Sequence, residues 1–181
     1  MRLFQAYRSF PWNPDIVTVD SLDNAVSLIA PDGDIDLVDN IKSAIELGEA
    51  ELQDLEIEED DGIVVPARHL KSIHNHVFPN QGWITQFRGV PVIHNHHMTP
   101  DHDIVNTLLD VMEKNSRIYD LDNLEDWYWD FSTVHPFRQN NSIVGNIVVS
   151  VISNFLCDTY LVALEEGVDI SGQCGTLRSQ M

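Results

Sequence analysis

Residues 135–143 read His-Pro-Phe-Arg-Gln-Asn-Asn-Ser-Ile, and a long apolar run follows them directly. This pattern predicts a histidine held on a loop that opens into a helix. A helix start offers unpaired backbone N–H groups and the positive end of a dipole, which together favour anions. A histidine beside such a site is suited to act as a general base next to a phosphate. The residues alone equally allow a buried histidine that caps a core helix.

The apolar run that begins at Asn141 predicts a central helix reaching to Gly167. Its first half is rich in Ile and Val, so propensity would also allow a strand. The run is too long for a strand, however, and Gly167 suits a helix C-terminus. Polar residues interrupt the run too often for a membrane span, namely Ser150, Ser153, Asn154 and Asp158.

Hydrophobic spacing predicts further helices over residues 37–55, 66–78, 101–112 and 124–131. Alternation of apolar and polar residues predicts a two-stranded hairpin over residues 83–97. The first thirty residues predict irregular chain with one short strand near residues 16–19. The expected fold class is therefore mainly α, with a single small hairpin.

The charge of the chain limits its partners. Its 181 residues suit one domain, and they carry 29 acidic against 10 basic side chains, a formal net charge of −19. Such a charge disfavours binding to the nucleic-acid backbone and favours a basic partner. Much of the excess lies between Glu46 and Asp61, which reads either as a solvated helix face or as an acidic mimic of nucleic acid.

Cysteine usage and the N-terminus indicate where the protein resides. Cys157 and Cys174 are the two cysteines and make no disulfide framework, and the N-terminus lacks the apolar core of a secretory signal. We therefore expect a cytoplasmic protein that does not enter the membrane.

The 135–143 stretch resembles the active-site motif of the Fic (Fic/Doc) family, His-Pro-Phe-x-(Asp/Glu)-Gly-Asn-(Gly/Lys)-Arg. The positions that match in register are His135, Pro136, Phe137 and Asn141. An upstream block at residues 70–88 resembles the family's helix with an Ile-His pair, followed by Trp-x-Gly-x-Phe-Arg and a hairpin called the flap. The resemblance implies a Fic-like domain over residues 63–181, preceded by an acidic N-terminal extension over residues 1–62.

Fic proteins move a phosphate-containing group, most often AMP from ATP, onto a hydroxyl of a target protein. The resemblance implies that His135 is the catalytic base. It also implies an anion site at Arg138, Gln139, Asn140, Asn141 and Ser142, and a flap that docks the target through Arg88, Val90, Val92 and Ile93. ATP or another nucleotide would be the donor.

The motif departs from the family where charge is needed. Gln139 replaces the acid that holds Mg²⁺, so a bound Mg²⁺ is doubtful. Ile143 replaces the motif arginine and Asn146 a second arginine, and losing such a cation costs on the order of a thousandfold in rate. The alternative is a Fic-like fold that has lost catalysis and binds protein through its flap or its acidic face.

A histidine cluster near the flap gives a metal alternative. It comprises His94, His96, His97 and His102, with Asp101 and Asp103 beside them. Two histidines on one strand face plus a carboxylate could bind Zn²⁺. The spacing fits no standard zinc pattern, so we predict a solvated end of the flap and no metal site.

Overall fold

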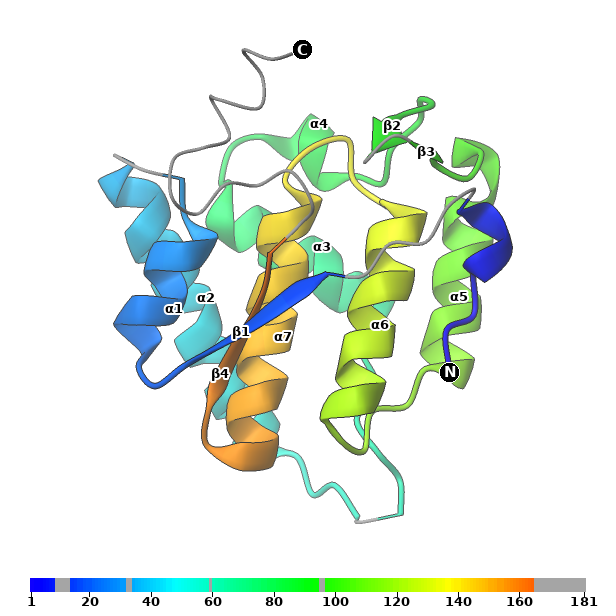
Figure 1. Cartoon of the computed structure of the whole chain (residues 1–181). Coiled ribbons are helices and arrows are strands. Elements are labelled where there is room, and N and C mark those ends of the chain that lie inside the picture. The colour runs from blue at the N-terminus through cyan, green and yellow to red at the C-terminus, as the bar shows by residue number, and fades with distance from the viewer. Residues whose placement is uncertain (9–13, 32–33, 59, 95–96, 165–181) are drawn as a thin grey trace.

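The computed structural model describes residues 1–8, 14–31, 34–58, 60–94 and 97–164, and this part of the chain is mainly helical (Figure 1). The helices are α1 (Leu22–Ile29), α2 (Ile35–Asp54), α3 (Ala67–Val77), α4 (Gly82–Thr85), α5 (Val105–Asn115), α6 (Leu121–Val134) and α7 (Asn141–Cys157). Short 3-10 turns occur at η1 (Gln5–Tyr7) and η2 (His102–Ile104). The strands are β1 (Asp15–Val19), β2 (Ile93–His94), β3 (His97–Met98) and β4 (Tyr160–Leu164). No helix among the described residues is long and apolar enough to cross a membrane.

Helix α7 is the centre of the fold, with α2 and α6 packed against it and β4 lying along it (Figure 1). Because it is covered on most sides, it is apolar around most of its circumference. Gly145 lets α6 approach closely, since a Cβ atom there would lie 2.8 Å from the Phe131 ring and 2.9 Å from the Tyr128 ring.

Helix α7 ends at Cys157, so the predicted continuation of the helix to Gly167 is wrong. Asp158 adopts a left-handed conformation at φ 53° and donates its N–H to the Asn154 carbonyl at 2.9 Å, which closes the helix. The chain then reverses into β4, which pairs antiparallel with β1. The pairing partner is distant in sequence, so the local pattern gave no sign of this strand. Gly167 lies outside the described residues.

The second edge of β4 is covered by side chains of α7 in place of another strand. Asn146 accepts from the Ala163 N–H at 2.7 Å and donates to the Ala163 carbonyl at 2.9 Å. Ser150 donates to the Leu161 carbonyl at 3.1 Å, and Ser153 accepts from the Leu161 N–H at 2.9 Å. The polar residues that interrupt the apolar run therefore satisfy a buried strand edge that would otherwise be unpaired.

Residues 1–62 share the core of the rest of the molecule. Ile41 and Ile45 of α2 are fully buried and belong to the same hydrophobic cluster as α6 and α7. Helix α1, which the sequence analysis did not predict, begins at Ser21, whose side chain accepts from the Asn24 N–H at 3.2 Å. The segment set apart as an acidic extension thus supplies one strand and two helices to the common structure.

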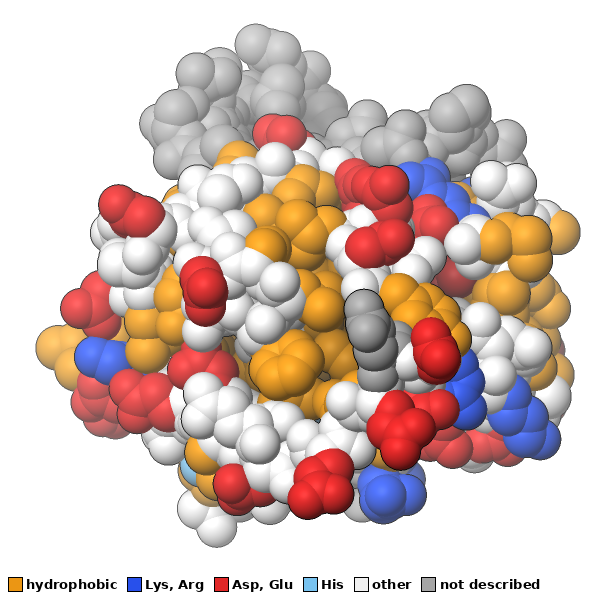
Figure 2. Space-filling model, turned by 90° about the horizontal axis from the view of Figure 1, so that it is seen from below, with side chains coloured by type: hydrophobic (Ala, Val, Ile, Leu, Met, Phe, Trp, Pro, Cys, Tyr) orange, Lys and Arg blue, Asp and Glu red, His pale blue; other side chains and the backbone are white. Residues whose placement is uncertain are grey.

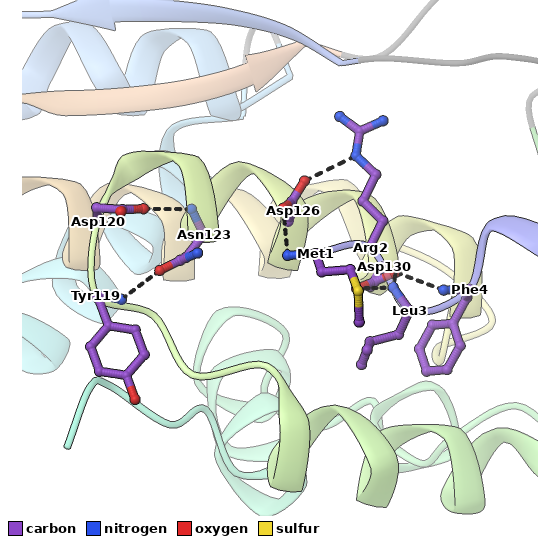
Figure 3. A network of polar contacts seen from close by, with 9 residues as sticks. All are labelled: Met1, Arg2, Leu3, Phe4, Tyr119, Asp120, Asn123, Asp126 and Asp130. Atoms are coloured by element: carbon purple, nitrogen blue, oxygen red, sulfur yellow. Dashed lines mark hydrogen bonds and ion pairs between the residues drawn. The ribbon is translucent and has the colours of Figure 1, made fainter. Parts of the chain in front are cut away.

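The first residues of the chain are fastened to α6 by carboxylates (Figure 3). The terminal ammonium of Met1 lies 2.8 Å from Asp126, and Asp130 accepts the N–H groups of Leu3 and Phe4 at 2.9 and 3.1 Å. Asp130 is fully buried, and this burial raises the pKa of its carboxyl group to about 6, although the two N–H groups act in the opposite direction.

The other predicted elements are present, some of them with different bounds. The helices expected over residues 37–55, 66–78, 101–112 and 124–131 are confirmed as α2, α3, α5 and α6, with Pro66 as the N-cap of α3 and η2 preceding α5. The strand near residues 16–19 is confirmed as β1. The hairpin is shorter than predicted, because residues 82–85 form the helical turn α4. Among the described residues, the hairpin consists of β2, β3 and one further backbone bond from the Thr99 N–H to the Val92 carbonyl.

Candidate functional site

His135 sits at the junction between α6 and the motif loop. It is the C-cap of α6, with φ 52° and ψ 62°, and its N–H bonds to the Phe131 carbonyl at 2.9 Å. The left-handed conformation reverses the chain, and Pro136 prevents the helix from continuing. The histidine is therefore placed where one helix ends and the loop toward α7 begins, with only 9% of its surface exposed.

Asn141 closes this loop through the oxygen and the nitrogen of its side-chain amide. Its oxygen accepts from the Phe137 N–H and its nitrogen donates to the Phe137 carbonyl, each at 2.8 Å. Asn140, at φ 66°, is the N-cap of α7 and makes no side-chain capping bond. The loop therefore leads into a helix start, where unpaired N–H groups and the helix dipole favour an anion.

His74 of α3 contacts the loop through its ring. It is fully buried, its Nε2 lies 3.3 Å from the Gln139 carbonyl, and its ring centre lies 4.6 Å from that of Phe137. Because a carbonyl oxygen only accepts, Nε2 carries the hydrogen. Thr85 Oγ1 lies 3.3 Å from Nδ1, the other ring nitrogen of His74. Burial lowers the pKa of His74, so the ring is neutral at pH 7.

Arg88, which the sequence analysis placed in the target-docking flap, bonds to the carbonyls at the end of α6. Its Nε donates to the His135 carbonyl at 2.7 Å, and one Nη donates to the Val134 carbonyl at 3.1 Å. Further bonds reach the carbonyls of Pro100 at 2.5 Å and Val90 at 3.0 Å. Arg88 is 4% exposed, and burial lowers the pKa of its guanidinium. A buried cation at a helix C-terminus satisfies its last carbonyls, so Arg88 positions the His135 backbone.

The flap hairpin presents apolar side chains outward. Ile93 of β2 and Met98 of β3 lie directly opposite each other and are 69% and 62% exposed. Val90 and Val92 are half-buried, and the Val92 carbonyl accepts from the Thr99 N–H at 3.0 Å. Of the four predicted docking residues, Ile93 is the one most fully displayed.

His94 is a site residue that the sequence analysis treated only as a possible metal ligand. Its ring lies over the His135 ring, with centres 4.3 Å apart and planes 32° from parallel. Its Nε2 lies 3.4 Å from Ser132 Oγ, which also accepts from Arg8 at 3.4 Å, and Arg8 Nε donates to Thr133 at 2.8 Å. A line of contacts therefore runs from the N-terminal segment to the candidate base. The signal in the sequence was weak: in a strand whose Ile93 faces outward, the next residue faces inward.

The two positions at which the resembled motif has arginine are buried in the core. Ile143 is 7% exposed, and Asn146 is 3% exposed and holds β4. Arg138 and Gln139 are exposed, and Ser142 is half-buried at the start of α7. Any phosphate here would therefore be held by backbone N–H groups, small polar side chains and Arg138. The Gln139 carboxamide is a weak ligand for Mg²⁺.

The predicted histidine cluster is not assembled around one point in the described residues. His94 turns to His135, His96 lies outside the described residues, and so does the side chain of His97. Ligand atoms of Asp101, His102 and Asp103 do lie within 4.8 Å of one another. His102 already contacts both carboxylates, at 3.3 and 3.4 Å, and these aspartates are exposed.

Comparison of the chain with protein-family models and with curated proteins gives no match to either.

Proposed function

We propose that residues 135–142 form the site of a divergent Fic-type transferase. It would move a phosphate-containing group, AMP or another nucleotide-derived moiety, onto a hydroxyl of a target protein. One observation carries the proposal: His135 and the uncapped start of α7 are held at the two ends of one loop, which the Asn141 amide closes on both sides.

Each residue of the loop has a role in this reaction. The N–H groups at the start of α7, with Asn140, Ser142 and Arg138, hold the donor phosphates. The target hydroxyl attacks the phosphorus, its proton passes to the imidazole of His135, and the bond to the leaving phosphate breaks. His94 restrains the His135 ring by stacking on it, and Arg88 fixes the backbone from which that ring projects.

The reaction would be slow compared with that of family members that keep their arginines. Ile143 and Asn146 stand where those members have arginines. Among the described residues of the loop, the exposed Arg138 is the one arginine. Loss of such a cation costs on the order of a thousandfold in rate. Stabilisation of the transferring phosphate would rest on backbone dipoles, which favours a donor of lower charge than ATP with Mg²⁺.

A second candidate function is binding of a protein without catalysis. The observation that favours it is the exposed pair of Ile93 and Met98 on the short hairpin, beside strand edges able to pair with an extended segment. This function needs no nucleotide. It would be impaired by Ile93→Asp and unaffected by His135→Ala.

Calorimetric titration with ATP, GTP, CDP-choline and UDP-glucose, each with and without Mg²⁺, separates the two candidates. The transferase proposal predicts that at least one donor binds and that Ser142→Asp, which places a carboxylate at the start of α7, weakens this binding. In a separate assay of donor hydrolysis, His135→Ala should abolish slow transfer of the bound group to water. If none of the donors binds, the transferase proposal fails and the hairpin becomes the leading candidate.

A further inference from the structure

A cavity of about 550 Å³ lies between α2, α3 and α7, and none of its lining residues belongs to the loop of residues 135–142. This volume is ordinary for a small-molecule site. Its walls are mainly aliphatic, with contributions from Leu52, Leu55, Ile63, Ile73, Ile147 and Val151.

The cavity is bounded where α2 and α7 come into contact. At Gly48 a Cβ atom would lie 2.9 Å from a methyl group of Val151, so the two helices are close there. Leu47 and Leu55 line the cavity but are 49% and 60% exposed, respectively. Large aliphatic side chains left in water at the mouth of an apolar cavity favour a ligand that would cover them.

The charge of the lining limits the ligand further. Among the described residues that line the cavity, Glu51 is the only carboxylate and none is Lys or Arg. The lining also contains two histidines, the half-buried His69 and the exposed His76. Burial lowers the pKa of His69, so His69 adds no positive charge at pH 7.5. Exposed acids follow Glu51 along the chain, namely Asp54, Glu56 and Glu58. Figure 2 shows apolar side chains gathered in the middle of the lower face, with carboxylates and a few Lys or Arg side chains around them.

We propose that this cavity binds a small amphipathic cation, with its alkyl body among the aliphatic walls and its ammonium group at Glu51. An alkyl carboxylate of the same length would meet Glu51 and the neighbouring acids with like charge. The inference does not depend on the transferase proposal, because it uses a different surface and no group of the loop.

The test compares three probes with one alkyl chain and different head groups: decylammonium, decanol and decanoate. Each is titrated into the full chain by calorimetry at pH 7.5, below its micelle concentration. Decylammonium is expected to bind one per chain and most tightly, and decanoate most weakly. Equal binding of decanoate and decylammonium, or no binding of any probe, overturns the proposal.

Two variants separate the charge from the apolar walls. Glu51→Gln should weaken decylammonium roughly two- to fivefold and leave decanol unchanged, since an exposed ion pair contributes modestly. Glu46→Gln, on the same helix but outside the lining, is the matched control and should change none of the affinities. Leu55→Ala should weaken all three probes alike, on the order of fivefold, because it removes apolar contact. Both Glu51 and Leu55 are exposed, so these changes spare the core. Decylammonium affinity that is insensitive to both variants overturns the proposal.

Discussion

Removing the Asn141 amide should destabilise the protein far more than the loss of an exposed asparagine. Asn141 is 4% exposed and satisfies both the N–H and the carbonyl of Phe137. Asn141→Ala leaves these two buried groups without partners, and each such group costs roughly 1–3 kcal/mol. The free energy of unfolding should therefore fall by about 2–5 kcal/mol, a large share of the ~5–15 kcal/mol typical of a domain.

Urea unfolding followed by tryptophan fluorescence measures this change, because Trp127 and Trp129 are buried in α6. The midpoint should fall by roughly 1–2 M urea at an ordinary slope. Asn115→Ala is the matched control, since Asn115 donates a single bond to the Val111 carbonyl and is exposed. Its effect should stay within about 0.5 kcal/mol. If Asn141→Ala is as mild as this control, the amide does not hold the loop and the account of the site is wrong.

Three further changes test other parts of the fold. Gly145→Ala should lower the melting temperature by about 2–10 °C, because the added methyl group overpacks against α6. The same change in an open helix is mildly stabilising, so a higher melting temperature would contradict the close contact between α6 and α7. Asn146→Leu should lower the free energy of unfolding by about 2–5 kcal/mol and speed hydrogen exchange of β4, because the N–H and the carbonyl of Ala163 both lose their partner. Ser150→Ala leaves only the Leu161 carbonyl without its partner, so an equal or larger loss of stability in Ser150→Ala would contradict this explanation. Asp130 has a native pKa of about 6, raised above its ordinary 3.8, so it contributes stability that is complete below pH 3.8 and lost as pH rises through 6. The unfolding free energy of wild type relative to Asp130→Asn should thus fall by about 2–3 kcal/mol between pH 4 and pH 7.5. Parallel pH curves for the two proteins would show that Asp130 does not titrate as stated.

The helices were predictable where their hydrophobic period was intact, as in α2, α3 and α6. The end of α7 was not predictable, because nothing near Asp158 reveals that residues 160–164 pair with β1 more than a hundred residues earlier. Ser150 and Ser153 were read only as interruptions of an apolar run, and their bonds to β4 become visible once that strand is in place.

Site residues that are close together in the sequence were predictable, but contacts between distant segments were not. His135 and Asn141 could be picked out because they share one short stretch with a helix start. Arg88 could be picked out as well, but whether an arginine points to solvent or into four carbonyls depends on how distant segments pack. The same holds for His94, whose contact with His135 joins residues forty-one positions apart.

The most direct test of the central claim is calorimetric titration of a donor that binds the wild type into Ser142→Asp and Ser142→Asn. Ser142 is the second residue of α7, where a carboxylate interacts favourably with the helix dipole but repels phosphate. If the start of α7 holds the donor phosphates, Ser142→Asp should be at least as stable as wild type and bind the donor at least about tenfold more weakly, because a negative charge would occupy the anion position. Ser142→Asn, which matches the Asp variant in size but is neutral, should bind the donor more tightly than Ser142→Asp does. Equal donor affinity in the Asp and Asn variants would contradict the claim that residues 135–142 hold the phosphate.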